Sequence, residues 1–422
     1  MKNLSERDQK HIWHPLTQHK LHPEMLAITK AKGCLLFDEE GKEYIDGISS
    51  WYTAVYGHCN DFIIERVYAQ MQQLDQVVFS GFTHEPAVKL SEELIKILPG
   101  NQEKLFFSDN GSTATEIGIK MALQYHFNQG DKRHVLLAFD NAFHGDTFGA
   151  MSVSGLSVYN GPFEEFFIAV ERVATPTKEN IGSILEKLEA RLQKNDIAGF
   201  IYEPLIQGAA AMQMHDAEGL EKILKLLKHY GVITVADEVM TGFGKTGKYF
   251  ASDHLSVQPD IMCMSKALTA GLVPMAVTSC TQQVYDAFYS TEISKGLFHG
   301  HTYTANPLAC TAAVAGIELL QSEEMQQNIQ RIIAAHQKFD AAIKNHPKIK
   351  TTRQTGTIYA LDLDVQMERY GNLRDKLLQH FMENGVFLRP LGHTIYISAP
   401  YVITAAQLQK IYDTITSALA II

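Results

Sequence analysis

The sequence predicts an α/β protein: a large domain with a mostly parallel sheet, and a smaller α+β domain built from both ends of the chain. In the middle of the chain, short apolar runs alternate with longer segments of helical periodicity, which is typical of α/β folds. At 422 residues and 45% hydrophobic, the chain can bury a large core and form more than one domain.

The central part contains the expected buried strands. They are KLFFS (104–108), HVLLAF (134–139), IAGFIYEP (197–204), GVITVADE (231–238), DIMCMS (260–265) and MAVTSC (275–280). Helices are expected between them. After the first strand, Ile117, Met121 and Tyr125 recur at helical spacing, and EGLEKILKLLKHYG is strongly amphipathic and ends at Gly231.

The two ends of the chain differ from the middle. GCLLFDEEGKEYIDG, within residues 27–50, predicts two short strands around a turn at Glu40-Gly41. After about residue 310 the chain is expected to be helical, then to end in GVFLRPLGHTIYISAP and a final helix. We therefore expect residues 1–55 and 311–422 to form the smaller domain and residues 56–310 to form the large one.

Charge and composition argue against several classes of protein. The net charge of -10 and pI near 6.0 disfavour a nucleic-acid binder, because phosphate contacts need a basic face. No apolar run of 18 or more residues occurs and the N-terminus lacks a signal-peptide core, so we expect no membrane span and no secretion signal. The five cysteines are scattered without a C-x-x-C pair, which favours reduced thiols in a cytoplasmic protein. Four histidines within residues 11–22 match no standard zinc spacing, so no metal site is predicted.

Polar residues stand at the ends of several expected strands. Ligands of open α/β sheets bind at the carboxyl ends of the strands, so we expect these residues to converge on one site. They are the segment SDNGST (108–113), Glu203, Asp237, Glu238 and Lys266.

The NGST segment (110–113) lies between a strand and a helix. Gly111 lets the backbone approach a ligand closely, and a helix N-terminus offers free N–H groups to an anion. With the hydroxyls of Ser112 and Thr113, this arrangement favours phosphate. The alternative is a helix N-cap with Glu116 as its capping partner, and the pattern alone leaves both open.

GFGKTGK (242–248) comes close to two nucleotide-binding patterns and completes neither. Tyr249 stands where a P-loop needs Ser or Thr, and residues 237–241 separate the first glycine from the strand. We interpret this segment as a flexible active-site loop.

Lys266 directly follows an apolar strand, where a long charged side chain is rarely buried without a partner. Pyridoxal phosphate needs an amine for its aldehyde, a carboxylate for its ring nitrogen and a cradle for its phosphate. Lys266, Asp237 and Gly111-Ser112 could supply these three. The alternative is a surface lysine with a packed aliphatic stem, and the combination of residues favours the cofactor site.

VADEVMTGFGKTGK and PDIMCMSKALTAG together resemble the signature of the class III pyridoxal-phosphate aminotransferases. Other stretches resemble the biotin-pathway branch of that family: IWHPLTQ, DGISSWYTAVYGHC, NGSTATEIGIKMALQY, FHGDTFGAMSVSG, HGHTYTANPLAC and RPLGHTIYISAP. The resemblance covers essentially the whole chain. It implies the fold type I of PLP-dependent transferases, a homodimer with active sites at the subunit interface, and small-molecule substrates as its other partners.

The resemblance also implies roles for single residues, with Lys266 as the catalytic residue that holds the cofactor aldehyde. The expected cofactor-binding residues are Gly111, Ser112, Phe143, Asp237, Lys266, His301 and Thr302, the last from the other subunit. The expected substrate-binding residues are Trp51, Tyr52, Phe143, Lys266, Gly300 and Arg389, with Arg389 pairing with a carboxylate. Without the resemblance, Trp51 and Tyr52 could be core aromatics and Arg389 part of a structural ion pair. Glu203 and Asp146 keep open roles.

The implied reaction is the transamination of 8-amino-7-oxononanoate to 7,8-diaminononanoate, usually with S-adenosylmethionine as the amino donor. Leu16 replaces a usual aromatic residue, Phe143 a common tyrosine and Lys245 a common arginine. Leu16 lacks the ring and hydroxyl expected to contact the donor, so lysine stays open as a second donor. The alternatives are another class III enzyme acting on ω-amino acids, an aminomutase that needs no external donor, and a non-catalytic pyridoxal-phosphate binder.

Overall fold

The computed structural model describes residues 4–157, 160–365 and 371–422. The largest sheet in these ranges has seven strands in the order β4-β12-β11-β10-β7-β5-β6. They are β4 (Gln102–Ser108), β5 (Val135–Phe139), β6 (Val170–Val173), β7 (Ile197–Tyr202), β10 (Ile233–Asp237), β11 (Ile261–Met264) and β12 (Ala276–Thr281). β12 runs antiparallel to β11 and β4, whereas the strands from β11 to β6 are parallel. The expected mostly parallel sheet and its central strands are confirmed, and β6 is an additional strand.

Successive residues of the central strands face opposite sides of this sheet. In β10, Val235 belongs to the cluster on the face covered by α5 (Gly111–Asn128), and Ala236 belongs to the core on the other face. That second core includes the buried face of α8 (Ala217–His229), which packs on β10. Because the strands are buried on both sides, their sequences are continuous apolar runs without alternation.

Helices connect these strands and cover the sheet. α8 ends at His229, and Gly231 stops the helix two residues later with a φ of +68°, a left-handed value that favours glycine. The other α-helices between residues 61 and 321 are α3 (Asp61–Met71), α4 (Glu85–Ile97), α6 (Phe148–Ser152), α7 (Ile181–Leu192), α9 (Gln282–Asp286) and α10 (Pro307–Gln321). Short 3-10 helices are η1 (Gly161–Phe166), η2 (Ala251–His254), η3 (Lys266–Thr269) and η4 (Ile293–Lys295).

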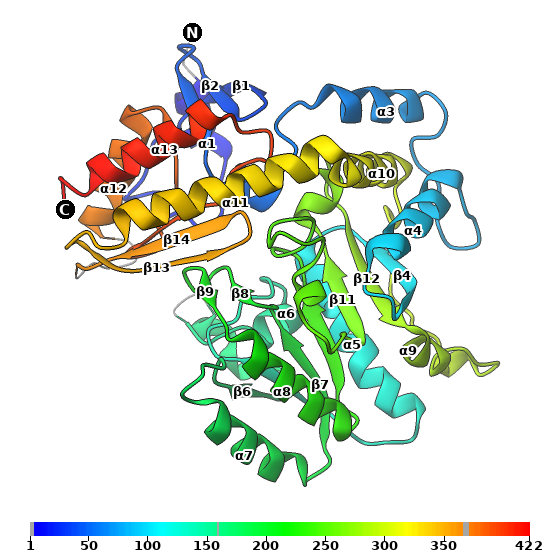
Figure 1. Cartoon of the computed structure of the whole chain (residues 1–422). Coiled ribbons are helices and arrows are strands. Elements are labelled where there is room, and N and C mark those ends of the chain that lie inside the picture. Colours follow the sequence, from blue (N-terminus) through cyan, green and yellow to red (C-terminus); the bar gives the residue numbers. More distant parts are fainter. Residues whose placement is uncertain (1–3, 158–159, 366–370) are drawn as a thin grey trace.

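Both ends of the chain contribute to one four-stranded sheet of the described residues. Its strands are β1 (Ile28–Lys32), β2 (Leu35–Asp38), β3 (Glu43–Asp46) and β15 (Val386–Phe387), in the order β1-β2-β3-β15. The expected turn joins β2 to β3, and Gly41 has a φ of +81°. Figure 1 shows the blue N-terminal and red C-terminal elements at the same end of the molecule. The domain bounds stay a prediction, and the bound at residue 310 falls within α10.

Beyond α10, the expected helical region is only partly present. α11 (Glu323–Ile343) is followed by a hairpin of β13 (Ile349–Thr355) and β14 (Ile358–Leu363), which the sequence did not predict. β16 (Thr394–Ile397) pairs with β14, so β13 is an edge strand and is mostly half-exposed. A polar edge strand carries no apolar run, which explains the omission. The remaining elements are α1 (Leu4–His11), α2 (Ser49–Tyr52), β8 (Ile206–Gln207), β9 (Gln213–Met214), α12 (Asn372–Glu383) and α13 (Ala405–Ala418).

Candidate active site

A cavity of about 850 Å³ opens at the carboxyl ends of β4, β7, β10 and β11. Residues that follow or end these strands line it: Asn110, Gly111, Ser112, Glu203, Asp237 and Lys266. The structure therefore brings together the strand ends that the sequence expects to converge. Glu238 is the exception, because its carboxylate is buried away from the cavity against Thr241 and Ser252.

Lys266 stands at the start of η3 with a left-handed φ of +49°, and its side chain lines the cavity. Its amine lies 5.0 Å from the centre of the Tyr52 ring and has no hydrogen-bond or ion-pair partner among the described residues. Burial lowers the pKa of Lys266, while the nearby charges of Asp237 and Glu203 raise it. A buried amine that is easily deprotonated can act as nucleophile and as base, so the alternative of a surface lysine is wrong.

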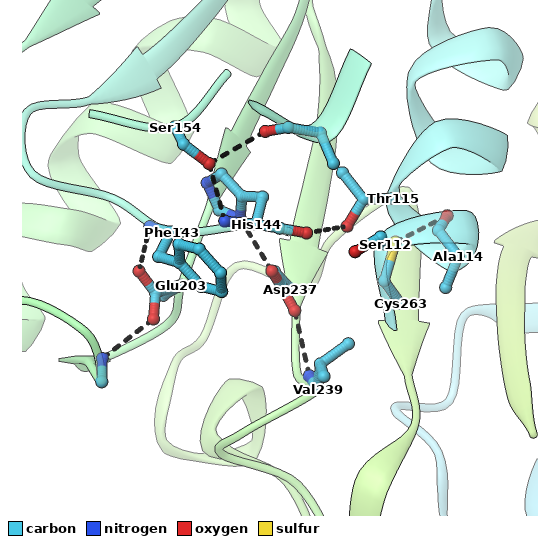
Figure 2. A network of polar contacts seen from close by, with 12 residues as sticks. Ser112, Ala114, Thr115, Phe143, His144, Ser154, Glu203, Asp237, Val239 and Cys263 are labelled. Carbon is cyan, nitrogen blue, oxygen red and sulfur yellow. Dashed lines mark hydrogen bonds and ion pairs between the residues drawn. The ribbon is translucent and has the colours of Figure 1, made fainter. Parts of the chain in front are cut away.

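The carboxylate of Asp237 is held from two sides (Figure 2). Oδ1 accepts a hydrogen bond from the N–H of Val239 at 3.0 Å, and Oδ2 lies 2.7 Å from Nδ1 of His144. The backbone of His144 is itself fixed, because its backbone N–H donates to Ser154 Oγ and its backbone carbonyl accepts from Thr115 Oγ1. Both side chains of the Asp237–His144 pair are buried. The pair therefore holds a fixed carboxylate at the cavity, where it suits a positively charged group.

His144 is a functional residue that the sequence analysis missed. It follows Phe143 directly, so a histidine beside the expected stacking residue was the available signal. Its Nε2 is buried without a partner in the described part of the chain. Because its partner Asp237 is 93 positions away, only the folded chain shows the pairing.

The helix-cap interpretation of the NGST segment is confirmed. The side chain of Asn110 accepts from the N–H of Thr113 at 3.0 Å, and Thr113 Oγ1 accepts from the N–H of Asn110 at 3.2 Å. This is a capping box at the start of α5. Its partner is Thr113, and the expected partner Glu116 instead accepts hydrogen bonds from Thr147 and Gly149.

The first turn of α5 is also shaped to receive an anion. A Cβ on Gly111 would lie 2.8 Å from Cγ1 of Val239, so glycine is required where α5 meets the cavity. Gly145, with a φ of +132°, passes so close that a Cβ there would lie 2.1 Å from Ser112 Oγ. Ser112 Oγ accepts from the N–H of Asp146 at 3.2 Å. The helix N-terminus and this hydroxyl both border the cavity, which suits a phosphate group.

Glu203 positions the segment that carries Phe143. One carboxylate oxygen accepts from the N–H of Phe143 at 3.0 Å and the other from the N–H of Gly208 at 2.9 Å (Figure 2). Burial raises the pKa of Glu203 to about 7, against the opposing effect of His144. Phe143 itself is 43% exposed and lines the cavity, so its ring is available for stacking on a planar ligand.

Trp51, Tyr52, Arg389 and Leu16 line a further part of the cavity. The guanidinium of Arg389 lies over the Trp51 ring at 4.7 Å, a cation–π contact. Tyr52 is buried and its hydroxyl donates to the hydroxyl of Tyr396 at 3.1 Å. Trp51 is therefore a cavity residue and not a core aromatic, while Tyr52 is both.

Gly300, His301 and Thr302 do not line this cavity, and Thr302 is exposed. The resemblance expects Thr302 to act in the site of another subunit, which agrees with a position outside the cavity of its own chain. The cofactor and substrate roles of these three residues stay predictions.

The 242–248 segment is not the active-site loop that the sequence predicts. Lys245 is 1% exposed, and no residue of the segment lines the cavity. The turn of the β13–β14 hairpin covers it, because Thr357 donates twice to the Lys245 carbonyl and a Cβ on Gly356 would lie 2.2 Å from Thr246. The Lys245 amine donates to the Gly242 carbonyl at 3.3 Å. Burial and the charge of Lys266 lower the pKa of Lys245 to about 7.

The described ranges contain no group of three or more His, Cys, Asp or Glu side chains arranged to hold a metal ion. None of their helices has the length and apolar character needed to cross a membrane. The five cysteines are unpaired, and all but Cys59 are buried.

Comparison with known proteins decides the family, because residues 16–419 match the model of the class-III aminotransferases. The chain belongs to this family. A curated class-III relative from Synechococcus elongatus, named adenosylmethionine-8-amino-7-oxononanoate aminotransferase, is 41% identical over 97% of this chain and 98% of its own length. A relative of the same name from Staphylococcus aureus is 35% identical over 93% of this chain and 92% of its own.

Solved structures of other aminotransferases have the same fold as this one. Adenosylmethionine-8-amino-7-oxononanoate aminotransferase from Methanocaldococcus jannaschii gives a TM-score of 0.92 at 32% identity, covering 99% of this chain and 98% of that one. An amine transaminase from an uncultivated Pseudomonas species, in its PLP-bound form, gives 0.91 at 26% identity over 97% and 98%. The fold expected from the resemblance is confirmed, and this class-III member is an aminotransferase.

Proposed function

We propose that this enzyme binds pyridoxal phosphate and transfers an amino group from S-adenosylmethionine to 8-amino-7-oxononanoate, a step of biotin biosynthesis. The observation that carries the proposal is the buried amine of Lys266, which has no partner among the described residues and borders a cavity that also contains Arg389. The names of the full-length relatives support the choice of substrates.

The residues around Lys266 fit pyridoxal phosphate. Asp237 would pair with the protonated ring nitrogen, Gly111 and Ser112 would hold the phosphate, and the ring of Phe143 would stack on the cofactor. The close approaches of Gly111 to Val239 and of Gly145 to Ser112 fix the first turn of α5 where it borders the cavity. When bound, the cofactor supplies an electron sink that stabilises negative charge on the substrate carbon.

The chain's own residues supply binding, orientation and proton transfer. The Nζ of Lys266 removes the proton from the amine-bearing carbon of the donor and later returns a proton, as base and then as acid. Asp237 stays aligned because Val239 and His144 hold both of its oxygens. Arg389 binds a substrate carboxylate through its planar guanidinium, and the ring of Trp51 keeps that group oriented.

We further propose a homodimer in which each subunit contributes to the site of the other. Gly300, His301 and Thr302 lie outside the cavity of their own chain, so Thr302 with His301 would complete the phosphate site of the partner. Large apolar side chains are exposed in the same segment, as expected for a protein interface. They are Tyr289, Ile293, Phe298 and Tyr303. A cytoplasmic location stays a prediction from the sequence.

Lysine is the second candidate donor, because Leu16 lines the cavity where an aromatic residue is usual. Leu16 is 55% exposed and offers no hydroxyl to a donor. Asp146 also borders the cavity and offers a carboxylate to a cationic donor of either kind.

The donor half-reaction tests this proposal directly. Cofactor-loaded protein is mixed with S-adenosylmethionine or with lysine, and the visible absorbance of the cofactor is followed until it takes the form of the amine. Conversion by S-adenosylmethionine supports the proposed donor, and conversion by lysine alone replaces it.

The second half-reaction then tests the acceptor. The amine form should be discharged by 8-amino-7-oxononanoate and not by ω-keto acids that lack its long chain. Discharge by the latter alone would favour the ω-amino acid alternative. Product formation with no donor at all would favour an aminomutase.

A further inference from the structure

The substrate-facing segment Ser49 to Tyr52 has an unusual backbone. Its four residues form a left-handed turn, with φ values of +50°, +44°, +66° and +73° in chain order. None of them is glycine, and L-residues avoid this region because the Cβ crowds the following carbonyl oxygen. Such strain persists only where surrounding contacts impose it, and it is typical of functional sites.

The turn brings two neighbouring rings to the same cavity. Trp51 lies below the guanidinium of Arg389 at 4.7 Å, and Tyr52 lies below the amine of Lys266 at 5.0 Å. In an extended strand, neighbouring side chains would face opposite sides. The left-handed turn therefore links the part of the cavity that binds a carboxylate to the part that carries the reactive amine.

A buried carboxylate holds one side of this turn. Asp46 ends β3 and is fully buried, and its Oδ1 accepts from the N–H of Ile48 at 3.2 Å. Its Oδ2 accepts from the Ser50 hydroxyl at 2.8 Å and lies 2.8 Å from Nε2 of His58. One side chain thus ties together the strand before the turn, the turn itself and the chain after it.

The far side of the turn is anchored on the C-terminal part of the chain. Ser49 Oγ donates to the carbonyl of Ser398 at 2.7 Å, and the Tyr52 hydroxyl donates to Tyr396. These contacts fix the ends of the turn but do not involve Ser50 or the ring of Trp51. Inside the turn, Thr53 Oγ1 donates to the Ser50 carbonyl at 3.0 Å, and Asp46 holds the Ser50 hydroxyl, next to Trp51.

Asp38 provides a matched reference in the same sheet. Its Oδ1 accepts from the N–H groups of Glu40 and Lys42 at 3.0 and 2.9 Å, and its Oδ2 accepts from the Tyr44 hydroxyl at 2.8 Å. Like Asp46, it accepts hydrogen bonds from backbone N–H and from a hydroxyl, and the contact of Asp46 with a histidine is the difference. The turn that Asp38 holds does not line the cavity.

We infer that Asp46 and His58 are a positioning pair for the amino-transfer reaction: they impose the left-handed turn and thereby set where Trp51 meets the substrate. Neither residue lines the cavity, so both act through the turn. The substrate named in the second experiment rests on the proposed function. The inference that Asp46 holds Trp51 in place does not rest on the proposed function, and the first experiment uses no substrate.

Tryptophan fluorescence of the cofactor-free protein tests the hold on the turn. The chain has two tryptophans, and Trp13 is almost fully exposed, so Trp13→Phe leaves Trp51 as the single reporter. In this background, Asp46→Asn should shift the emission and raise acrylamide quenching about twofold, because the turn relaxes and exposes the ring. Ser50→Ala removes only the hydroxyl contact and should act in the same direction by less. Asp38→Asn should change neither quantity, and unchanged emission in both Asp46→Asn and Ser50→Ala would overturn the inference.

Steady-state kinetics test the consequence for the reaction. In Asp46→Asn the KM for 8-amino-7-oxononanoate should rise about tenfold with kcat within about threefold, because a displaced binding surface weakens substrate and transition state alike. The visible absorbance of the bound cofactor should not change, and Asp38→Asn should keep the parent KM. A fall in kcat at unchanged KM would contradict a positioning role. If the parent protein itself fails to turn over this substrate, the proposed function is wrong, and Trp51 fluorescence still decides the inference.

Discussion

Two segments near the carboxyl ends of the central strands each carry a lysine, Lys266 and Lys245, and only Lys266 borders the cavity. Lys266 begins η3 with its amine at the cavity, whereas Lys245 lies in the 242–248 segment under the β13–β14 turn. Burial lowers the pKa of both. A lowered pKa is therefore no sign of catalysis by itself. What distinguishes Lys266 is access to the cavity and the nearby carboxylates of Asp237 and Glu203.

The largest expected difference between the two lysines is in turnover. Lys266→Ala should reduce turnover by at least about 10³-fold, because no other amine lines the described cavity to act as nucleophile and base. Circular dichroism and thermal unfolding should show an intact fold. Lys245→Met is the matched variant and should retain turnover within about threefold, since its side chain does not reach the cavity. Normal turnover in Lys266→Ala would show that Lys266 is not the nucleophile and base, and that the two lysines do not differ in this respect.

Glu203→Gln tests whether the charge of Glu203 raises the pKa of Lys266. The charge of Glu203 raises the pKa of Lys266, so the variant should show the amine titrating at lower pH. Glu203 has a pKa of about 7, and its charge is present mainly above that value. Parent and variant should therefore differ most above about pH 7 and converge below it, as measured by the pH profile of the donor half-reaction. Glu238→Gln changes a buried carboxyl outside the cavity, and an equal shift there would show that Glu203 has no specific effect.

Lys245→Met should stabilise the fold, by an amount that depends on pH. The pKa of Lys245 is lowered from 10.5 to about 7 in the folded protein, so between these values the unfolded chain binds the proton more tightly. The contribution of Lys245 to stability consequently falls as pH drops from 10.5 to 7 and stays low below that. Methionine removes this penalty, for a gain on the order of 2–4 kcal/mol near pH 7 that vanishes towards pH 10.5.

Thermal unfolding of the parent and Lys245→Met across this pH range measures the effect. Lys228→Met is a suitable control, because Lys228 is a partly exposed lysine paired with Asp260 at 2.7 Å. It should give no gain at any pH. A gain in Lys245→Met that does not change with pH would point to packing and not to the buried charge.

The central sheet could be predicted from the sequence because its strands are buried on both faces. Runs such as IMCM in β11 are apolar at every position and are followed by residues of the site. Parallel strands end at the same edge of a sheet. The convergence of Lys266, Asp237 and Glu203 could therefore be predicted from their positions at the ends of expected strands. The resemblance to a family added the residues that no strand end identifies, such as Arg389.

The features that could not be predicted from the sequence depend on contacts between distant parts of the chain. β13 is a polar edge strand with no apolar pattern, and the turn after it covers the 242–248 segment, which was wrongly predicted to be a flexible active-site loop. The role of His144 follows from Asp237, 93 positions later, and the left-handed turn follows from contacts of Asp46. No local propensity encodes a left-handed turn of Ser, Ser, Trp and Tyr, because it is imposed by its surroundings.

The hydrogen bond from Ser49 to Ser398 joins residues 349 positions apart, and that from Tyr52 to Tyr396 joins residues 344 apart. Translation runs from the N-terminus, so the strands that carry Asp237 and Lys266 leave the ribosome long before either anchor. The nascent chain therefore carries the strand-end residues of the site before it can anchor the Trp51–Tyr52 wall. A chain cut short before residue 396 would lack both anchors of that wall.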